Sequence, residues 1–290
     1  MKPIHILLML CTVAVWGFNF VATRVALDVF SPEQMAFARS VLTLAILLPW
    51  WKPFKRIPWQ LMAAALAIGT GSFYLLYQAI SMTESLTTVA IGTQLMPPLS
   101  AILALLFFHE QISSRKWLGI LIATSGAVYL AGATTSSLSV AALGMTVLSV
   151  IMYSAGSIVI GKYKSVSVWS MLAWISAMSL LPLGLMAAVS GPLYPDLSLM
   201  QTHHWLAFLF SAVFSALMGQ AVLFSLYRRY PVADVAPWAL FIPFFAGLSS
   251  ILVFGETISL SLFLGGAIVL LGVWVQQSSD GRTAKETPTF

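Results

Sequence analysis

Polar and aromatic side chains recur at helical spacing inside segments that are otherwise apolar. In the first segment Thr12, Trp16, Asn19 and Thr23 are spaced four, three and four residues apart, so a helix places them on one face. Amides, hydroxyls and aromatic rings on converging faces can recognise a small polar solute without covalent chemistry. Three later segments repeat the pattern, with Thr70, Tyr74, Tyr77 or Gln78, and Ser81; Thr87, Ile91, Gln94 and Pro98; and Thr146, Ser149, Tyr153 and Ser157.

Each polar stripe also has a structural explanation. Ser and Thr hydroxyls often bond to backbone carbonyls within the membrane, and small residues allow helices to pack closely. For Asn19, the only asparagine of the chain, and for Gln94, packing and cavity lining are equally open. Core packing also stays open for the deeper aromatic residues. The candidate substrate-binding residues are Trp16, Asn19, Arg39, Tyr74, Tyr77, Gln78, Gln94, Tyr153, Trp174, Gln220, Trp238 and Phe241.

Arg39 lies about two helical turns inside the second apolar segment. An unpaired arginine at the centre of a membrane helix costs ~2.5–3.5 kcal/mol, so it must have a partner or a wet cavity. The planar guanidinium suits a carboxylate or a phosphate. Two interpretations stay open: Arg39 binds a substrate carboxylate, or it is tied structurally to Glu33, Asp28 or backbone carbonyls.

Prolines and acidic residues bear on the mechanism. Pro97, Pro98 and Pro243 interrupt helical hydrogen bonding and are candidate hinges, with static kinks as the alternative. All nine acidic residues fall in loops or at helix ends, whereas a proton-coupled carrier commonly uses a buried carboxylate. We therefore expect facilitated or exchange transport. If protons couple, the relay is expected at Glu33 or Glu84.

Composition indicates an integral membrane protein. Hydrophobic residues make up 59% of the chain and charged residues 8%, whereas a soluble domain carries roughly 25% charged residues. About 20 apolar residues cross the hydrocarbon layer as a helix. The predicted fold class is all-α, with ten transmembrane helices at about 4–24, 33–51, 59–80, 86–108, 116–134, 140–161, 168–190, 204–227, 232–254 and 260–277.

Basic residues predict the orientation of these helices. Loops on the cytoplasmic side of a membrane protein are enriched in Lys and Arg. With the N-terminus in the cytoplasm, 12 of the 14 basic residues fall in cytoplasmic segments, and both termini are cytoplasmic. The charge therefore does not predict a nucleic-acid partner. These residues are Lys2, Lys52, Lys55, Arg56, Arg115, Lys116, Lys162, Lys164, Arg228, Arg229, Arg282 and Lys285.

The chain also matches itself at an offset of 146 residues. The segment that begins at residue 107 aligns with the segment that begins at residue 253, so that Glu110 falls on Glu256 and Gly126 on Gly272. We expect a five-helix repeat at 1–134, a second at 135–277, and a disordered cytoplasmic tail at 278–290. An odd number of spans inverts the second copy, which is typical of secondary transporters that bind substrate between the repeats. A duplication kept only for packing is the alternative.

Four short motifs connect the chain with a known family. WGFNFVATRVAL (16–27), ARSVL (38–42), FFHEQIS (107–113) and VFGETIS (253–259) resemble EamA-type drug/metabolite transporters. The resemblance covers residues 5–277 and is greatest to bacterial exporters of amino acids and related metabolites. It implies ten helices in the bacterial inner membrane, with the first four of each half around a cavity and the fifth and tenth peripheral. A small-molecule substrate and a monomer or homodimer are expected.

Other functions find less support in the sequence. GSIVIGKY (156–163) lacks the Ser or Thr that ends a phosphate-binding loop and lies in a membrane span. No hydrolase motif or Cys/His metal cluster occurs, so we expect no enzyme activity, no cofactor and no metal. A transporter of nucleosides, sugars or drugs is the main alternative, followed by a channel or a membrane-embedded enzyme.

Overall fold

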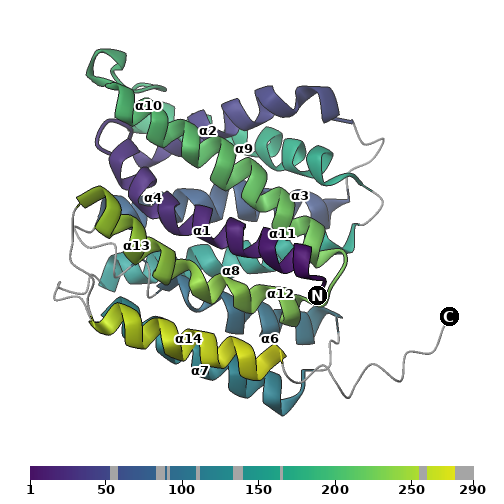
Figure 1. The fold of residues 1–290 in the computed structure, drawn as a ribbon. Helices are drawn as coiled ribbons and strands as arrows, with labels where there is room; N and C mark the ends of the chain where they lie inside the picture. The colour runs from purple at the N-terminus through teal and green to yellow at the C-terminus, as the bar shows by residue number, and fades with distance from the viewer. Residues whose placement is uncertain are drawn as a thin grey trace.

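The structure is a computed structural model that describes residues 1–52, 58–82, 89, 92–108, 112–132, 140–163, 166–254 and 260–277. Glu84 and the predicted tail 278–290 lie outside these residues. Every regular element within them is a helix (Figure 1). In chain order the helices are α1 (Pro3–Ala26), α2 (Pro32–Leu47), η1 (Leu48–Trp50), α3 (Trp59–Leu66), η2 (Ala67–Ser72), α4 (Phe73–Ser81), α6 (Met96–Phe108), α7 (Ser114–Gly132), α8 (Val140–Lys162), α9 (Val168–Ser190), η3 (Leu197–Leu199), α10 (Thr202–Leu209), η4 (Phe210–Gly219), α11 (Gln220–Tyr227), α12 (Val232–Val235), η5 (Ala236–Phe241), α13 (Ile242–Phe254) and α14 (Leu260–Gln277).

Six helical stretches of the described chain are long and apolar enough to cross a membrane. The all-helical membrane fold predicted from composition is thereby confirmed. Two shorter apolar helices, Met96–Phe107 and Leu264–Val275, coincide with further predicted spans. Ten spans, the inverted repeat and cytoplasmic termini stay predictions. The six stretches are Pro3–Ala26, Trp59–Ser81, Val140–Gly161, Val168–Ser190, Thr202–Tyr227 and Val232–Ser249.

Helix ends follow the local sequence. Ser31 and Gln34 form a capping box at the start of α2, in which each side chain bonds to the other residue's backbone N–H. Ser167 accepts a hydrogen bond from the backbone N–H of Ser170 and so caps α9. The same helix ends at Gly191, whose φ of 153° is a conformation that side chains disfavour.

Two membrane-spanning stretches contain π-helical segments. In the stretch from Trp59 to Ser81, the π-helix η2 separates α3 from α4. In the stretch from Thr202 to Tyr227, the π-helix η4 separates α10 from α11. At the sequence offset of 146 residues, Ala67–Ser72 falls inside Phe210–Gly219. π-Helical turns are rare in proteins, and those that occur are often found at functional sites. The space between the two segments is therefore a candidate site.

The helices pack in pairs that join distant parts of the chain. In Figure 1, α7 and α14 lie side by side at the lower edge of the molecule, with α13 between them and α1. Gly126 of α7 faces Ile268, and Gly272 of α14 faces Ala123, so the glycines allow close approach. Elsewhere α1 packs on α13, α2 on α9 and α4 on α8.

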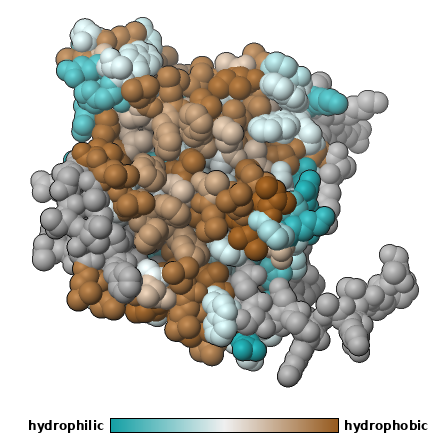
Figure 2. Space-filling model, viewed as in Figure 1, coloured by the Kyte–Doolittle hydropathy of each residue, from teal (hydrophilic) through white to brown (hydrophobic). Residues whose placement is uncertain are grey.

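The surface agrees with a membrane environment. Figure 2 shows one face that is mostly hydrophobic, with hydrophilic residues gathered near the start of α10 and near the N-terminus. Large apolar side chains on several helices are exposed, for example Leu181 at 72% and Val189 at 88%. In water such a surface would drive aggregation. The two hydrophilic zones therefore mark the two ends of the helices that face water.

The candidate hinge prolines do not interrupt continuous α-helices. Pro97 and Pro98 lie in the first turn of α6, which begins at Met96, and Pro243 is the second residue of α13. Proline is tolerated in a first turn because the missing N–H has no helical partner there. The carbonyl of Ala239, four residues before Pro243, is not free, because the backbone N–H of Ile242 donates to it. A hinge role for the three prolines stays a prediction.

Candidate functional site

A cavity of about 110 Å³ lies at the centre of the bundle, between α1, α4, α6, α8, α13 and the two π-helical stretches. On α1 it begins at Trp16 and reaches Thr23, in the half of the helix away from the N-terminus. On α4 it extends to Ile80, one residue before that helix ends. Its lining residues are Trp16, Asn19, Phe20, Thr23, Ser72, Phe73, Leu76, Ile80, Thr93, Met96, Ser149, Val150, Tyr153, Ser215, Gln220 and Ile242.

One wall of the cavity comes from α1. The indole N–H of Trp16 donates to the backbone carbonyl of Ser215 in η4, at 3.2 Å. Gly219, at the end of η4, lies against the same indole, and a Cβ there would come within 2.6 Å of Nε1. The ring is therefore held by a hydrogen bond and by close contact with Gly219.

Asn19 lies one turn beyond Trp16 on the same face. Its Oδ1 is buried and has no hydrogen-bond partner among the residues that the structure describes. A buried amide oxygen without a partner costs roughly 1–3 kcal/mol. A ligand or water with a donor group in the cavity would remove that cost.

The opposite wall comes from η2, α4 and α8. The hydroxyl of Ser149 donates to the backbone carbonyl of Ser72 at 2.8 Å, and the two side-chain hydroxyls lie 3.1 Å apart. The rings of Phe73 and Tyr153 meet edge to face, with centroids 6.1 Å apart. This wall thus joins aromatic surface to a small hydroxyl pair.

The two π-helices make the same kind of contact at the two walls of the cavity. At each, a backbone carbonyl accepts a hydrogen bond from a side chain of a neighbouring helix: Ser72 from Ser149 and Ser215 from Trp16. Both accepting carbonyls thus lie in π-helical segments, which are often found at functional sites.

Gln220 and Arg39 meet at a second cavity of about 10 Å³, next to the first. Gln220 and Phe73 line both cavities, whereas Arg39 lines only the smaller one. The Cζ atom of Arg39 lies 3.4 Å from the centroid of the Phe73 ring. The ring of Phe73 therefore lies between the guanidinium and the larger cavity.

Four of the candidate residues line the larger cavity: Trp16, Asn19, Tyr153 and Gln220. Tyr77 is 1% exposed and packs in a cluster with Phe30, Met35 and Phe208. Tyr74 interacts with Glu33, at the end of the bundle away from the N-terminus.

The remaining candidates lie away from the larger cavity. Trp174 donates its indole N–H to the carbonyl of Lys52 at 3.0 Å. Trp238 and Phe241 stack on each other in η5, with ring centroids 6.0 Å apart. Gln94 is 1% exposed, and its amide nitrogen lies 3.3 Å from the hydroxyl of Thr93, which does line the cavity. Gln78 is half-buried and lines neither cavity.

Polar contacts join distant parts of the chain at the end that holds the N-terminus. His5 Nδ1 lies 2.6 Å from the hydroxyl of Tyr230, which also accepts a hydrogen bond from the backbone N–H of Lys2 at 3.1 Å. Lys116 of α7 forms an ion pair with Asp234 of α12. These contacts tie α1 and α7 to the segment around α12.

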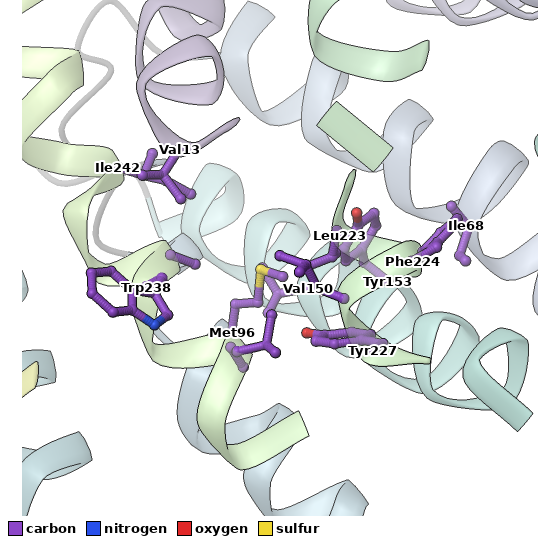
Figure 3. Packing of buried hydrophobic residues seen from close by; sticks show 14 of the residues in the cluster. Val13, Ile68, Met96, Val150, Tyr153, Leu223, Phe224, Tyr227, Trp238 and Ile242 are labelled. Atoms are coloured by element: carbon purple, nitrogen blue, oxygen red, sulfur yellow. The ribbon is translucent and has the colours of Figure 1, made fainter. Parts of the chain in front are cut away.

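Buried hydrophobic side chains continue from the wall of the cavity. Figure 3 shows Met96 and Val150, which line the cavity, beside Tyr227 and Trp238. All four belong to one buried cluster that also includes Phe224, which is fully buried. On this side the lining of the cavity thus continues into closely packed, buried side chains.

Sequence reasoning did not identify Phe73 or Ser215 as candidates. Phe73 follows the π-helix η2, and Ser215 lies in the π-helix η4. A π-helical turn changes which residues face the cavity, and a regular α-helical spacing does not predict that change. Within the described residues no group of three His, Cys, Asp or Glu side chains could hold a metal ion.

Comparisons with known proteins agree with this architecture. The model of the EamA-like transporter family matches residues 3–132 and again residues 140–276. Proteins of Escherichia coli (strain K12) and Salmonella typhimurium, each named "Probable amino-acid metabolite efflux pump", are 24% identical over 278 residues, which is 92% of this chain and 93% of theirs. An "Uncharacterized transporter" of Archaeoglobus fulgidus is 24% identical over 91% of this chain and 95% of its own. One crystal structure shares the fold with a TM-score of 0.78 at 15% identity, over 96% of this chain and 99% of that one.

Proposed function

The chain belongs to the EamA-like transporter family, and from that premise we propose that it exports amino acids or closely related small metabolites across the bacterial cytoplasmic membrane. The observation that carries the proposal is the central cavity, where an amide oxygen without a partner among the described residues, two hydroxyls and an aromatic wall meet. Two relatives whose names include amino-acid metabolite efflux support the choice of substrate class.

The dimensions of the cavity favour a small solute. A dry protein cavity of about 150 Å³ holds benzene, a molecule of six heavy atoms. The central cavity, at about 110 Å³, thus suits an amino acid with a small side chain rather than a nucleotide or a lipid. Asn19 and Gln220 would bond its polar groups, and Trp16, Phe73 and Tyr153 would contact its apolar part.

The transport mechanism that we propose is alternating access between two five-helix repeats, 1–134 and 135–277. Residues of both halves line the cavity, which supports a binding site between the repeats. The positive-inside pattern assigns the N-terminal end to the cytoplasm. On that assignment, the buried cluster around Tyr227 and Trp238 and the polar contacts at the N-terminal end support a conformation that is closed toward the cytoplasm.

Coupling to protons is not required by this arrangement. Among the described acidic residues, none lines either cavity. We therefore propose facilitated or exchange transport by one chain, in which Glu33 has a local role beside Tyr74 rather than in proton transfer.

Counterflow in proteoliposomes tests the proposal. Purified protein is reconstituted with a panel of unlabelled amino acids inside, and uptake of labelled amino acid is followed. We expect saturable counterflow for a subset of the panel, with at least a tenfold loss of uptake in Asn19→Leu. Cys11→Ala is the matched control, because Cys11 is exposed on the same helix and lines neither cavity.

The alternatives give different results in the same assay. Counterflow of nucleosides or sugars, with none for any amino acid, would contradict the substrate class and leave the carrier mechanism intact. Flux that does not saturate would contradict alternating access and indicate a channel.

A further inference from the structure

The smaller cavity next to the central one has a charge but, within the described part of the chain, no counter-charge. It is enclosed by α2, α9 and the two π-helical stretches, and its polar lining comes from Arg39, Ser40, Thr43, Ser176 and Gln220. Arg39 is 5% exposed, and its Nε is buried without a hydrogen-bond partner among the described residues. Within the same residues, no carboxylate forms an ion pair with it.

Aromatic rings supply only part of what the guanidinium needs. Arg39 lies over the face of Phe73 at 3.4 Å and within 5.7 Å of the Tyr77 ring, so both rings stabilise the cation. They do not accept the in-plane Nε–H. A buried cation normally has both a counter-charge and acceptors for its N–H groups. The cavity beside Arg39 is the place where such a partner can bind.

We propose that the smaller cavity is a binding site for a single-atom monovalent anion, with chloride as its ligand. A volume of about 10 Å³ holds one particle of about the size of water, which excludes phosphate, sulfate and an amino acid. The guanidinium of Arg39 supplies the charge. Thr43, Ser176 and Gln220 can add O–H and N–H donors, whereas the hydroxyl of Ser40 already donates to the carbonyl of Ala36.

The position of Phe73 favours a free ion over the carboxylate of a transported substrate. Its ring lies between the guanidinium and the central cavity, so a carboxylate there cannot reach Arg39 without displacing the ring. A small ion in the second cavity needs no such movement. Through Phe73 and Gln220, which line both cavities, the anion would hold one wall of the substrate site in place.

Thermal unfolding of the purified full-length protein in neutral detergent tests the proposal. Sodium chloride is titrated against sodium gluconate at constant ionic strength, because gluconate is too large for the cavity. We expect Tm to rise saturably with chloride, by roughly 2–4 °C, since a ligand stabilises the state that binds it. The rise should be absent in Arg39→Gln and present in Arg24→Gln. Arg24 is the matched control, because it donates to the carbonyl of Ile80 and lines neither cavity.

Two milder variants keep the test valid if Arg39→Gln does not fold. Thr43→Val and Ser176→Ala remove one hydroxyl each and leave the cation in place, so each should raise the half-saturating chloride concentration several-fold. An unchanged midpoint in both variants would overturn the assignment to this cavity. Equal Tm in chloride and gluconate for the wild type, or a rise that persists in Arg39→Gln, would overturn it as well.

Acetate and glycine, added in place of chloride, test whether the smaller cavity binds a carboxylate rather than a chloride ion. A rise in Tm that depends on Arg39 and occurs with these carboxylates but not with chloride would overturn the proposal and assign the cavity to the carboxylate of the substrate. Because Tm is measured without transport, a failure of counterflow leaves this result unaffected.

Discussion

The indole N–H of Trp16 bonds to the backbone carbonyl of Ser215, 199 positions later in the chain. The bond connects α1 to the π-helix η4 directly at the wall of the central cavity. Ser149 and the carbonyl of Ser72 form the corresponding contact between α8 and η2. Each π-helical stretch is thus held by a helix from the other half of the chain, so a relative movement of the halves must break or shift these bonds.

Trp16→Phe should weaken both stability and transport. The substitution keeps an aromatic ring on Gly219 but removes the only donor to the Ser215 carbonyl that Trp16 can offer. Loss of one such hydrogen bond costs about 0.5–1.5 kcal/mol. We expect a lower Tm and a reduced maximal rate of counterflow. Trp59→Phe is the control, because Trp59 is 69% exposed at the start of α3 and lines neither cavity; equal effects of the two changes would contradict a specific role.

Gly69→Ala should destabilise the protein, although alanine is normally the better helix former. A Cβ at Gly69 of η2 would clash with the hydroxyl of Ser179 and lie 3.0 Å from the carbonyl of Ile175 in α9. Overpacking of this kind costs about 1–3 kcal/mol. Gly144→Ala in α8 is the matched control, since a Cβ there meets no atom within 4 Å. Thermal unfolding should show a lower Tm for Gly69→Ala and an unchanged or higher Tm for Gly144→Ala.

The helical spacing in the sequence predicted the cavity-lining residues correctly on the regular helix α1 but not on the helix that follows the π-helix η2. On α1 the spacing of Trp16, Asn19 and Thr23 predicted the lining face, because the helix is regular from Pro3 to Ala26. In the third predicted span the same rule selected Tyr74 and Tyr77. The wider turns of η2 change which side of the following helix, α4, faces the cavity. Phe73, Leu76 and Ile80 therefore line the cavity in place of Tyr74 and Tyr77.

Other differences between prediction and structure come from turns and helix pairing. Residues 94 and 95 form a turn rather than part of a helix, so Thr93 lines the cavity and Gln94 does not. Trp174 lies beside Trp51 because α9 packs on α2, at a ring-centroid distance of 5.5 Å. The pairing of two particular helices depends on tertiary packing, which the period of one segment does not contain. The all-helical fold, by contrast, follows from the apolar composition and the length of the apolar segments.

Gly272→Ala should loosen the pair formed by α7 and α14 and leave the cavities unchanged. A Cβ at Gly272 would collide with the backbone of Ala123, and at the matching position Gly126 it would come within 2.7 Å of Ile268. We expect a decrease of about 1–3 kcal/mol in stability, as in Gly69→Ala. The substrate concentration for half-maximal counterflow should stay unchanged, because neither glycine lines a cavity. A weaker apparent affinity for substrate would show that this helix pair does affect the central cavity.

Asp234→Asn should open the bundle at the end that holds the N-terminus. The carboxylate pairs with Lys116 where α7 meets α12, and both side chains are 14% exposed. A partly exposed ion pair contributes about 0.4–1 kcal/mol, which corresponds to a roughly two- to fivefold change in an opening equilibrium. In a Cys11→Ser background, a cysteine introduced at the buried Val235 should then react with maleimide faster by that factor. The exchanged pair Lys116→Asp with Asp234→Lys should restore slow labelling, whereas equally fast labelling in the exchanged pair would show that the ion pair does not hold this end closed.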